Sequence, residues 1–346
     1  MSRFSFPALS RSARRAGGVL ATCLAAASMV SCGGGTQAKR FVPESFVVFG
    51  DDFALIKTDS ARYNINTYRT GSTSTYTCNS QVSWVMLFAF DLGFKFPNEC
   101  PDWNAAGEKT AVMLANDPTT VGLSATEIDT AVAHAGANAV LTTIQNNRSL
   151  FNDKALVTVS VGRADIVKAY FTYLETPDAA TLSSLTSQLK TLGAGFAAGL
   201  KPVVTSGARM MVVLTPNLGE SPLAKSDASN LTRNKDALST LSNAFNDGLT
   251  FALTTNGYTG QQVALVDVPR AQKSVLASYA SYGYSDIDTS ACPSPQTVAP
   301  LCEVGTLTDA ATVLATYFWA DPTHLSVAFD STIASTTYSA FQNHPF

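Results

Sequence analysis

An aspartate and a histidine near the C-terminus have the spacing of an acid–base pair. Asp321 lies three residues before His324, and the chain has only three histidines. An imidazole works as a general base when its other ring nitrogen has an acceptor, because the acceptor fixes the tautomer and the charge of the ring. An Asp-x-x-His turn that opens a helix supplies both groups from one loop. We predict that Asp321 and His324 form such a pair, although a surface loop with an incidental histidine has the same pattern.

Polar residues also follow three of the continuous apolar runs, which are expected to be strands buried on both faces. In an open parallel sheet, ligands bind outside the carboxyl ends of the strands. The residues after these runs are therefore the place to look for a site. They are Gly50-Asp51-Asp52 after residues 46–49, Gly162-Arg163-Ala164-Asp165 after residues 155–161, and Thr215-Pro216-Asn217 at the end of residues 208–215.

The order of apolar runs and helical stretches predicts the fold class. A fourth apolar run covers residues 263–268. Strands that alternate with helices are typical of an α/β protein whose parallel sheet is covered on both faces. No low-complexity linker divides the chain after residue 44, so we predict one domain over residues 44–346. The expected helices cover residues 83–92, 124–146, 178–200 and 232–255, and a last helix begins near residue 325.

The last block of the sequence resembles a known enzyme family. Residues 317–324, Tyr-Phe-Trp-Ala-Asp-Pro-Thr-His, are similar to the final block of the SGNH (GDSL-type) ester hydrolases, above all their outer-membrane esterase branch. Further similarities follow in the family's order from residue 44 onward: Phe49-Gly50-Asp51, Ser83-Trp84-Val85, residues 212–222, and Tyr282-Gly283-Tyr284 before Cys292. This resemblance implies a three-layer α/β/α sandwich (SGNH hydrolase-like, flavodoxin-like) and hydrolysis of carboxylic esters, with Asp321 and His324 as the acid–base pair.

Two functional positions of the family differ in this chain. The resemblance implies a serine nucleophile directly after Gly-Asp, but this position holds Asp52. It also implies an asparagine that donates to the oxyanion, and Ala164 takes its place two residues after Gly162. The glycine of the family's second block aligns with Gly136, with Gly107 as the alternative. Loss of the nucleophile costs on the order of 10⁶ in turnover and loss of one oxyanion donor about 10²–10³. We therefore expect little or no esterase activity.

Asp52 has three interpretations. In the first, Asp52 forms an inert ion pair with His324 at a helix N-terminus, where the amides and the helix dipole stabilise the carboxylate. Alternatively it is a carboxylate nucleophile, which suits displacement at saturated carbon better than attack on an ester. In the third case the chain is a working ester hydrolase with an unrecognised nucleophile.

The N-terminal residues have the pattern of an exported lipoprotein. Residues 1–31 contain four arginines, no acidic residue and an apolar run over 19–30 that is too short to span a bilayer. A small residue, Ser31, precedes Cys32, as in a bacterial lipobox; an ordinary signal peptide is the alternative. We expect a signal at 1–31, a lipid on Cys32, a tether over 32–43, and anchoring in the bacterial cell envelope.

Composition and cysteines limit the remaining functions. The formal charge is −3, and removal of the four signal arginines leaves the mature chain at −7. Such a chain has no electrostatic footprint for nucleic acid. We expect no cofactor or metal, the membrane lipid as one partner, and a small ester or acyl ligand. Export places the four remaining cysteines in an oxidising compartment. Pairing of neighbours predicts Cys78–Cys100 and Cys292–Cys302.

Overall fold

The computed structural model describes residues 40–346 apart from 105–106, 120–122, 261, 293–301 and 308. Phe41–Phe346 forms one compact unit. The predicted signal, Cys32 and most of the predicted tether lie outside the described residues. Among the described residues, no helix combines the length and the apolar character that a membrane crossing requires.

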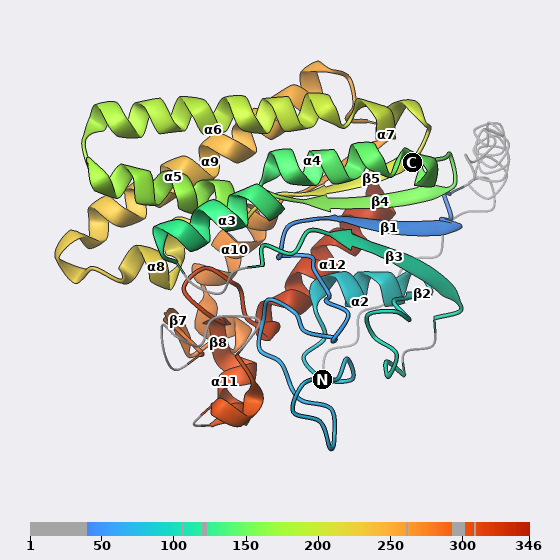
Figure 1. The fold of residues 1–346 in the computed structure, drawn as a ribbon, viewed down its shortest axis with the longest axis horizontal. Coiled ribbons are helices and arrows are strands. Elements are labelled where there is room, and N and C mark those ends of the chain that lie inside the picture. Colours follow the sequence, from blue (N-terminus) through green and yellow to red (C-terminus); the bar gives the residue numbers. More distant parts are fainter. Residues whose placement is uncertain (1–39, 105–106, 120–122, 261, 293–301, 308) are drawn as a thin grey trace, which may run out of the picture. The chain divides into compact units, whose positions relative to one another are not determined.

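A six-stranded sheet forms the centre of this unit, in the order β2-β3-β1-β4-β5-β6 (Figure 1). All five strand pairs are parallel. All residues of β4 and five of the six in β1 are buried, as expected for central strands covered on both faces. The strands are β1 Ser45–Gly50, β2 Phe94–Lys95, β3 Lys109–Ala115, β4 Ala155–Ser160, β5 Arg209–Val213 and β6 Val263–Val266.

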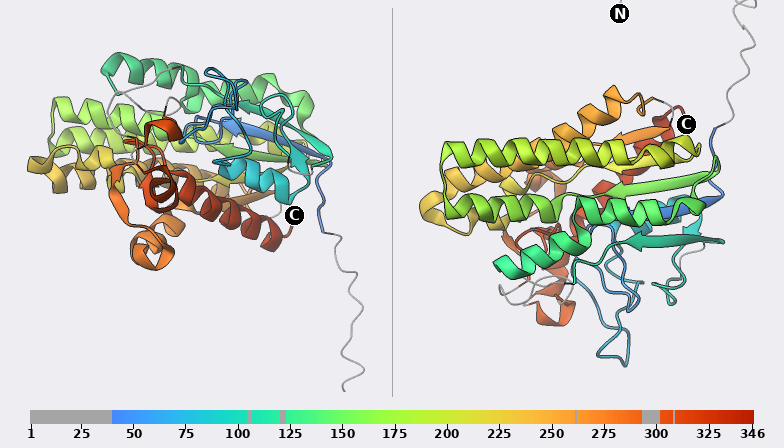
Figure 2. Two further views of the ribbon diagram at one scale, coloured as in Figure 1. Left: turned by 90° about the horizontal axis from the view of Figure 1, so that it is seen from below. Right: turned by 45° about the horizontal axis from the view of Figure 1, so that its top comes forward.

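Helices cover both faces of the sheet, so the predicted three-layer α/β/α architecture is confirmed. One layer is formed by α2 and α12, which pack on each other and on the sheet, and α10 adjoins α12. The other layer contains α3, α4, α5, α6 and α9, with a long α6–α9 contact. Figure 2 (left) shows α3 and α4 on one side of the sheet, and α2 and α12 on the other. The helices of at least seven residues are α2 Trp84–Asp91, α3 Ala125–Ala135, α4 Ala137–Asn146, α5 Arg163–Glu175, α6 Ala179–Gly199, α9 Leu231–Thr255, α10 Val268–Leu276, α11 Ala310–Thr316 and α12 Val327–Asn343.

Several predicted elements differ from the observed ones. The helix expected over 124–146 is two helices, because Gly136 adopts an extended conformation between α3 and α4. The strands β2 and β3 were not predicted, nor was the parallel pair of β7 (Asp286–Ser290) and β8 (Tyr317–Trp319). Short helical turns complete the fold: α7 Lys201–Thr205, α8 Pro222–Lys225, and the 3₁₀ turns η1 Arg148–Leu150, η2 Leu218–Glu220, η3 Ala228–Asn230, η4 Tyr279–Tyr282 and η5 Val304–Thr306.

The long connection between β1 and α2 (residues 51–83) contains no helix or strand, yet it is firmly attached. Its Cys78 is bonded to Cys100, and Asn64 donates a hydrogen bond of 2.5 Å to Asp330. The backbone of Asn66 exchanges hydrogen bonds with residues 302 and 304, next to the Cys292–Cys302 bond. Both predicted disulfides are therefore confirmed, and together they hold this connection at the carboxyl end of the sheet.

Candidate functional site

The carboxyl end of β1 makes a turn that only glycine fits. Gly50 has φ +150°, and a Cβ there would lie 2.3 Å from the carbonyl oxygen of Ser160. The next residue, Asp51, is buried and accepts hydrogen bonds from the backbone N–H groups of Phe53, Gly162 and Arg163 at 3.1, 3.1 and 3.3 Å. Burial and the neighbouring Asp52 raise the pKa of Asp51 to about 7. Asp51 thus ties the end of β1 to the start of α5.

Asp52 lies in the centre of a buried ion cluster. Its side chain is paired through both oxygens with Arg163: Nε donates to Oδ1 at 2.9 Å and Nη2 donates to Oδ2. Nε2 of His324 lies 3.1 Å from the same Oδ2. Burial alone would raise the pKa of Asp52, but the charges of Arg163 and His324 outweigh it and hold this pKa well below its ordinary value. Asp52 is therefore an anion with both carboxylate oxygens occupied.

His324 is held between two carboxylates. Its Nδ1 lies 2.7 Å from Oδ2 of Asp321, and its Nε2 faces Asp52. The backbone N–H groups of Thr323 and His324 donate to Oδ1 of Asp321, which fixes the turn. Burial and the charge of Arg163 lower the pKa of His324, but Asp321 and then Asp52 raise it, and the result is about 9. The imidazole is therefore protonated at neutral pH. The structure thus brings the side chains of Asp321, His324 and Asp52 together.

Arg163 belongs to this site, although we predicted no role for it from the sequence. It is the first residue of α5, is only 8% exposed, and also donates to Oγ1 of Thr323 at 3.1 Å. Burial lowers the pKa of Arg163, but the charge and the hydrogen bonds of Asp52 raise it above its ordinary value. The guanidinium therefore stays charged. A signal existed in the sequence: a buried carboxylate requires a cation, and Arg163 is one of the polar residues that follow a predicted strand. The expected helix N-terminus at Asp52 is wrong, because residues 51–54 form turns and the side chain of Arg163 supplies the donors.

The connection between β1 and α2 covers the site. The ring of Tyr63 lies 5.4 Å from the imidazole of His324, between ring centres, and its hydroxyl donates to Asp117 at 2.9 Å. The remaining cavity beside Arg163 and His324 has a volume of about 10 Å³. This space holds one water molecule at most.

The candidate oxyanion residues lie at different places. The N–H of Gly136 donates to the carbonyl of Val132, and that of Gly162 donates to Asp51, so both hydrogens are engaged. Gly107 precedes β3 and therefore lies at the opposite end of the sheet from Asp52.

Ala164 stands at the position where the family resemblance implies an oxyanion asparagine. Ala164 is buried in the first turn of α5, and the next residue, Asp165, accepts a hydrogen bond from the N–H of Ala137 at 2.9 Å. Burial raises the pKa of Asp165 to about 6. Within the part of the chain that the structure describes, no group of three or more His, Cys, Asp or Glu side chains is arranged to hold a metal ion.

Comparison with known proteins gives distant structural likenesses. No family model matches the chain, and no curated protein matches it in sequence. The chain is similar to an α/β hydrolase enzyme from the metagenome of Lake Arreo, Spain (15% identity, TM-score 0.42, 87% of this chain and 96% of the other). It is also similar to a catalytic mutant of an acetylxylan esterase from Geobacillus stearothermophilus (12% identity, TM-score 0.42, 88% and 96%). These identities are far below the level at which a shared family follows.

Proposed function

We propose that this chain is an ester-hydrolase scaffold with little or no esterase activity, kept as a binding module of the bacterial cell envelope. One observation carries the proposal. Nε2 of His324, the atom that would accept a proton from a serine nucleophile, lies 3.1 Å from Oδ2 of Asp52, which is also paired with Arg163. A general base must be unprotonated and must reach a hydroxyl. Here the imidazole is a cation and its partner is a carboxylate.

Asp52 as a nucleophile is a weaker alternative. A carboxylate attacks with a lone pair of one oxygen, and both oxygens of Asp52 accept hydrogen bonds from Arg163. These charge-assisted bonds stabilise the anion and reduce its reactivity. The cavity of about 10 Å³ at the site is also too small for an ester or an alkyl halide. Attack by Asp52 would require both the salt bridge and the Tyr63 cover to open.

Two measurements on the purified mature chain test the proposal. Hydrolysis of p-nitrophenyl acetate by the wild type should equal that of a His324→Ala variant. A fluorophosphonate probe, which labels activated serines, should leave the wild type unlabelled. Robust activity that depends on His324, together with labelling of a mapped serine, would show a displaced nucleophile and overturn the proposal.

We also propose that the chain is exported and held at the membrane by a lipid on Cys32. The two disulfides support an oxidising compartment, since such bonds rarely persist in a reducing cytosol. The basic, then apolar N-terminus and the Ser31-Cys32 pair support the lipid attachment.

A further inference from the structure

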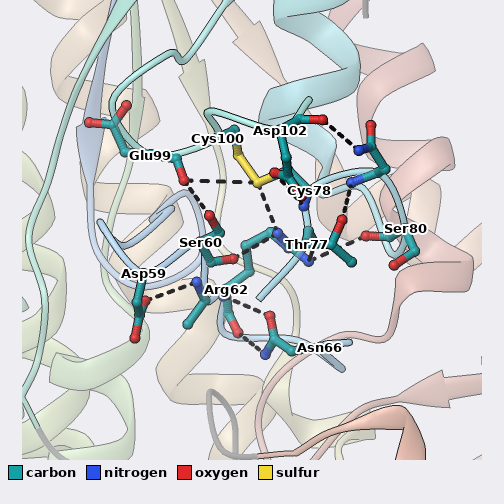
Figure 3. The surroundings of a disulfide bond; sticks show 12 residues. Asp59, Ser60, Arg62, Asn66, Thr77, Cys78, Ser80, Glu99, Cys100 and Asp102 are labelled. Carbon is teal, nitrogen blue, oxygen red and sulfur yellow. Dashed lines mark hydrogen bonds between the residues drawn. A yellow bond between two sulfur atoms is a disulfide. The ribbon is translucent and has the colours of Figure 1, made fainter. Parts of the chain in front are cut away.

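A buried arginine lies against one of the disulfides. Arg62 belongs to the connection that covers the site and is 1% exposed. Its Nη1 donates to the sulfur of Cys78 at 3.3 Å and to the carbonyl of Ser60 at 2.8 Å. Its Nη2 donates to the carbonyls of Thr77 and Ser80 at 3.1 and 3.3 Å. Figure 3 shows the guanidinium between the disulfide and these carbonyl groups.

The charge of Arg62 is not neutralised by direct contact. Within the described residues, no carboxylate lies at ion-pair distance from Arg62, and its buried Nε has no hydrogen-bond partner. Burial lowers the pKa of Arg62 to about 10, and the more distant Asp330, Asp102 and Asp59 only partly offset this effect. A buried cation is costly unless an anion pairs with it. Among the described atoms that accept hydrogen bonds from the guanidinium, the sulfur of Cys78 can become an anion, whereas the others are backbone carbonyl oxygens.

We propose that Cys78 and Cys100 form a redox-active pair, which an exported protein dithiol reduces and in which Arg62 holds Cys78 as the thiolate. A positive side chain beside a cysteine lowers the pKa of its thiol, and a thiol of lower pKa is the better leaving group in thiol–disulfide exchange. Reduction therefore gives Arg62 the counter-ion that it lacks. This gain favours the reduced form relative to a disulfide without a neighbouring cation.

The contact with Arg62 determines which sulfur is attacked. One thiolate of the dithiol attacks Sγ of Cys100; the new S–S bond forms there while the Cys78–Cys100 bond breaks, and its electron pair leaves on Cys78. The second thiol of the reductant then attacks its own sulfur in the mixed disulfide and releases Cys100. The dithiol is oxidised to a disulfide by two electrons. Of its two protons, one ends on Cys100 and one goes to solvent, because Cys78 remains a thiolate.

The surroundings of the two sulfurs agree with this direction. Cys78 is fully buried against Arg62, whereas Cys100 is 3% exposed and lies in a turn next to the exposed Pro101. A reductant therefore approaches from the side of Cys100 after a small opening of this turn. The residue after Arg62 is Tyr63, which covers His324. The Cys78–Cys100 disulfide therefore lies close to the segment that covers His324.

Equilibration of the mature chain with mixtures of reduced and oxidised dithiothreitol tests the proposal. After alkylation, mass spectrometry gives the reduced fraction of each disulfide. Replacement Arg62→Met should require at least a tenfold higher ratio of reduced to oxidised dithiothreitol to open Cys78–Cys100, about 30 mV. The Cys292–Cys302 bond is the internal reference, and its ratio should stay the same. An unchanged ratio for Cys78–Cys100 in a folded Arg62→Met protein would overturn the proposal.

A second measurement does not depend on whether the Arg62 variant folds. Cys100→Ser leaves Cys78 as a single thiol beside Arg62, and Cys78→Ser leaves Cys100 as the matched control. Thiolate absorbance near 240 nm, followed against pH, should show a midpoint for Cys78 at least one pH unit below that for Cys100. If Cys78 titrates at the same pH as Cys100 or higher, Arg62 does not hold a thiolate and the proposal fails.

Discussion

Asp52 and Asp321 bind opposite nitrogens of the His324 imidazole. Oδ2 of Asp52 lies 3.1 Å from Nε2, and Oδ2 of Asp321 lies 2.7 Å from Nδ1. An imidazole between two carboxylates is stable as a cation, because each nitrogen then carries a hydrogen with an anionic acceptor. Arg163 balances the second carboxylate, so the cluster contains two cations and two anions. Each charged group of this cluster is paired with a group of opposite charge, so none of them is free to accept a proton.

The Asp52–Arg163 pair should dominate the stability of this region. Removal of one partner of a buried ion pair leaves an uncompensated charge and typically costs about 3–5 kcal/mol. We expect Asp52→Asn and Arg163→Met each to lower the free energy of unfolding by roughly this amount. The double variant should lose much less than the sum of the two, because no isolated charge remains.

Urea unfolding of the four proteins measures this coupling. The control is Lys168→Met, which breaks the exposed Lys168–Asp129 pair of 2.7 Å and should have a much smaller effect. Additive losses in the double-mutant cycle would show that Asp52 and Arg163 do not act as a pair.

Stability should depend on pH through His324. Its pKa rises from 6.5 in the unfolded chain to about 9 in the fold. A raised pKa contributes stability that is complete below pH 6.5 and is lost as the pH rises through 9. The pKa of Asp52 is depressed, so its contribution is present above its ordinary value of 3.8 and is lost as the pH falls below it. The cluster is therefore most stabilising between these limits, near pH 4–6.5.

A comparison of His324→Gln with the wild type isolates the contribution of this imidazole. The difference in unfolding free energy should be largest near pH 6 and should shrink by up to about 3 kcal/mol by pH 9.5. His134→Gln replaces an exposed histidine and should show no such trend. A difference that stays constant across this range would mean that His324 is not a buried cation.

The central strands and the long helices could be predicted from the sequence, and the edge of the sheet could not. Runs such as β4 are apolar throughout because both faces are buried. By contrast, β3 is mostly half-exposed and is rich in alanine, methionine and leucine, which favour helices. Its pairing with β1 and β2 makes it a strand. The break at Gly136 was missed because the apolar period continues across it.

At the site, the order of the motifs in the sequence pointed to Asp52, Asp321 and His324. The contacts between segments that are distant in the chain could not be predicted. Asp52, Asp321 and His324 come together because the ends of β1 and β8 meet at the carboxyl edge. The roles of Arg163 and Tyr63 depend on partners far away in the chain. Tyr63 lies in a connection without a helix or strand, so no periodicity indicates where its ring points. Its position is fixed by Asp117 and the disulfide-held loops.

Membrane attachment should depend on a single cysteine. We expect Cys32→Ser to move the protein from the membrane fraction to the soluble fraction, because the lipid would be lost with the thiol. Cys23→Ser changes a cysteine within the apolar part of the predicted signal and should leave the protein membrane-bound. Fractionation after washing without detergent provides the measurement. Retention of the Cys32→Ser chain in the membrane would show that another feature anchors it.

Esterase activity should appear when a serine replaces Asp52 and the charge of Arg163 is removed. Asp52→Ser alone places a hydroxyl near Nε2 of His324 but leaves Arg163 buried without its carboxylate, which destabilises the fold. The double variant Asp52→Ser/Arg163→Asn removes that charge and supplies a neutral amide beside the new hydroxyl. We expect a measurable rate of p-nitrophenyl acetate hydrolysis that His324→Ala abolishes.

Addition of Ala164→Asn to this double variant tests the position that the family resemblance assigns to an oxyanion donor. A well-placed donor is worth about 10²–10³ in turnover, and an imperfect one less, so a gain of at most about 10²-fold is expected. The rate should increase with pH through the titration of His324, because only the neutral imidazole accepts the proton of the serine. The variant loses Asp52, which raises the pKa of His324, and Arg163, which lowers it, while Asp321 stays beside Nδ1. A rate that does not change with pH would contradict the role of His324 as the base.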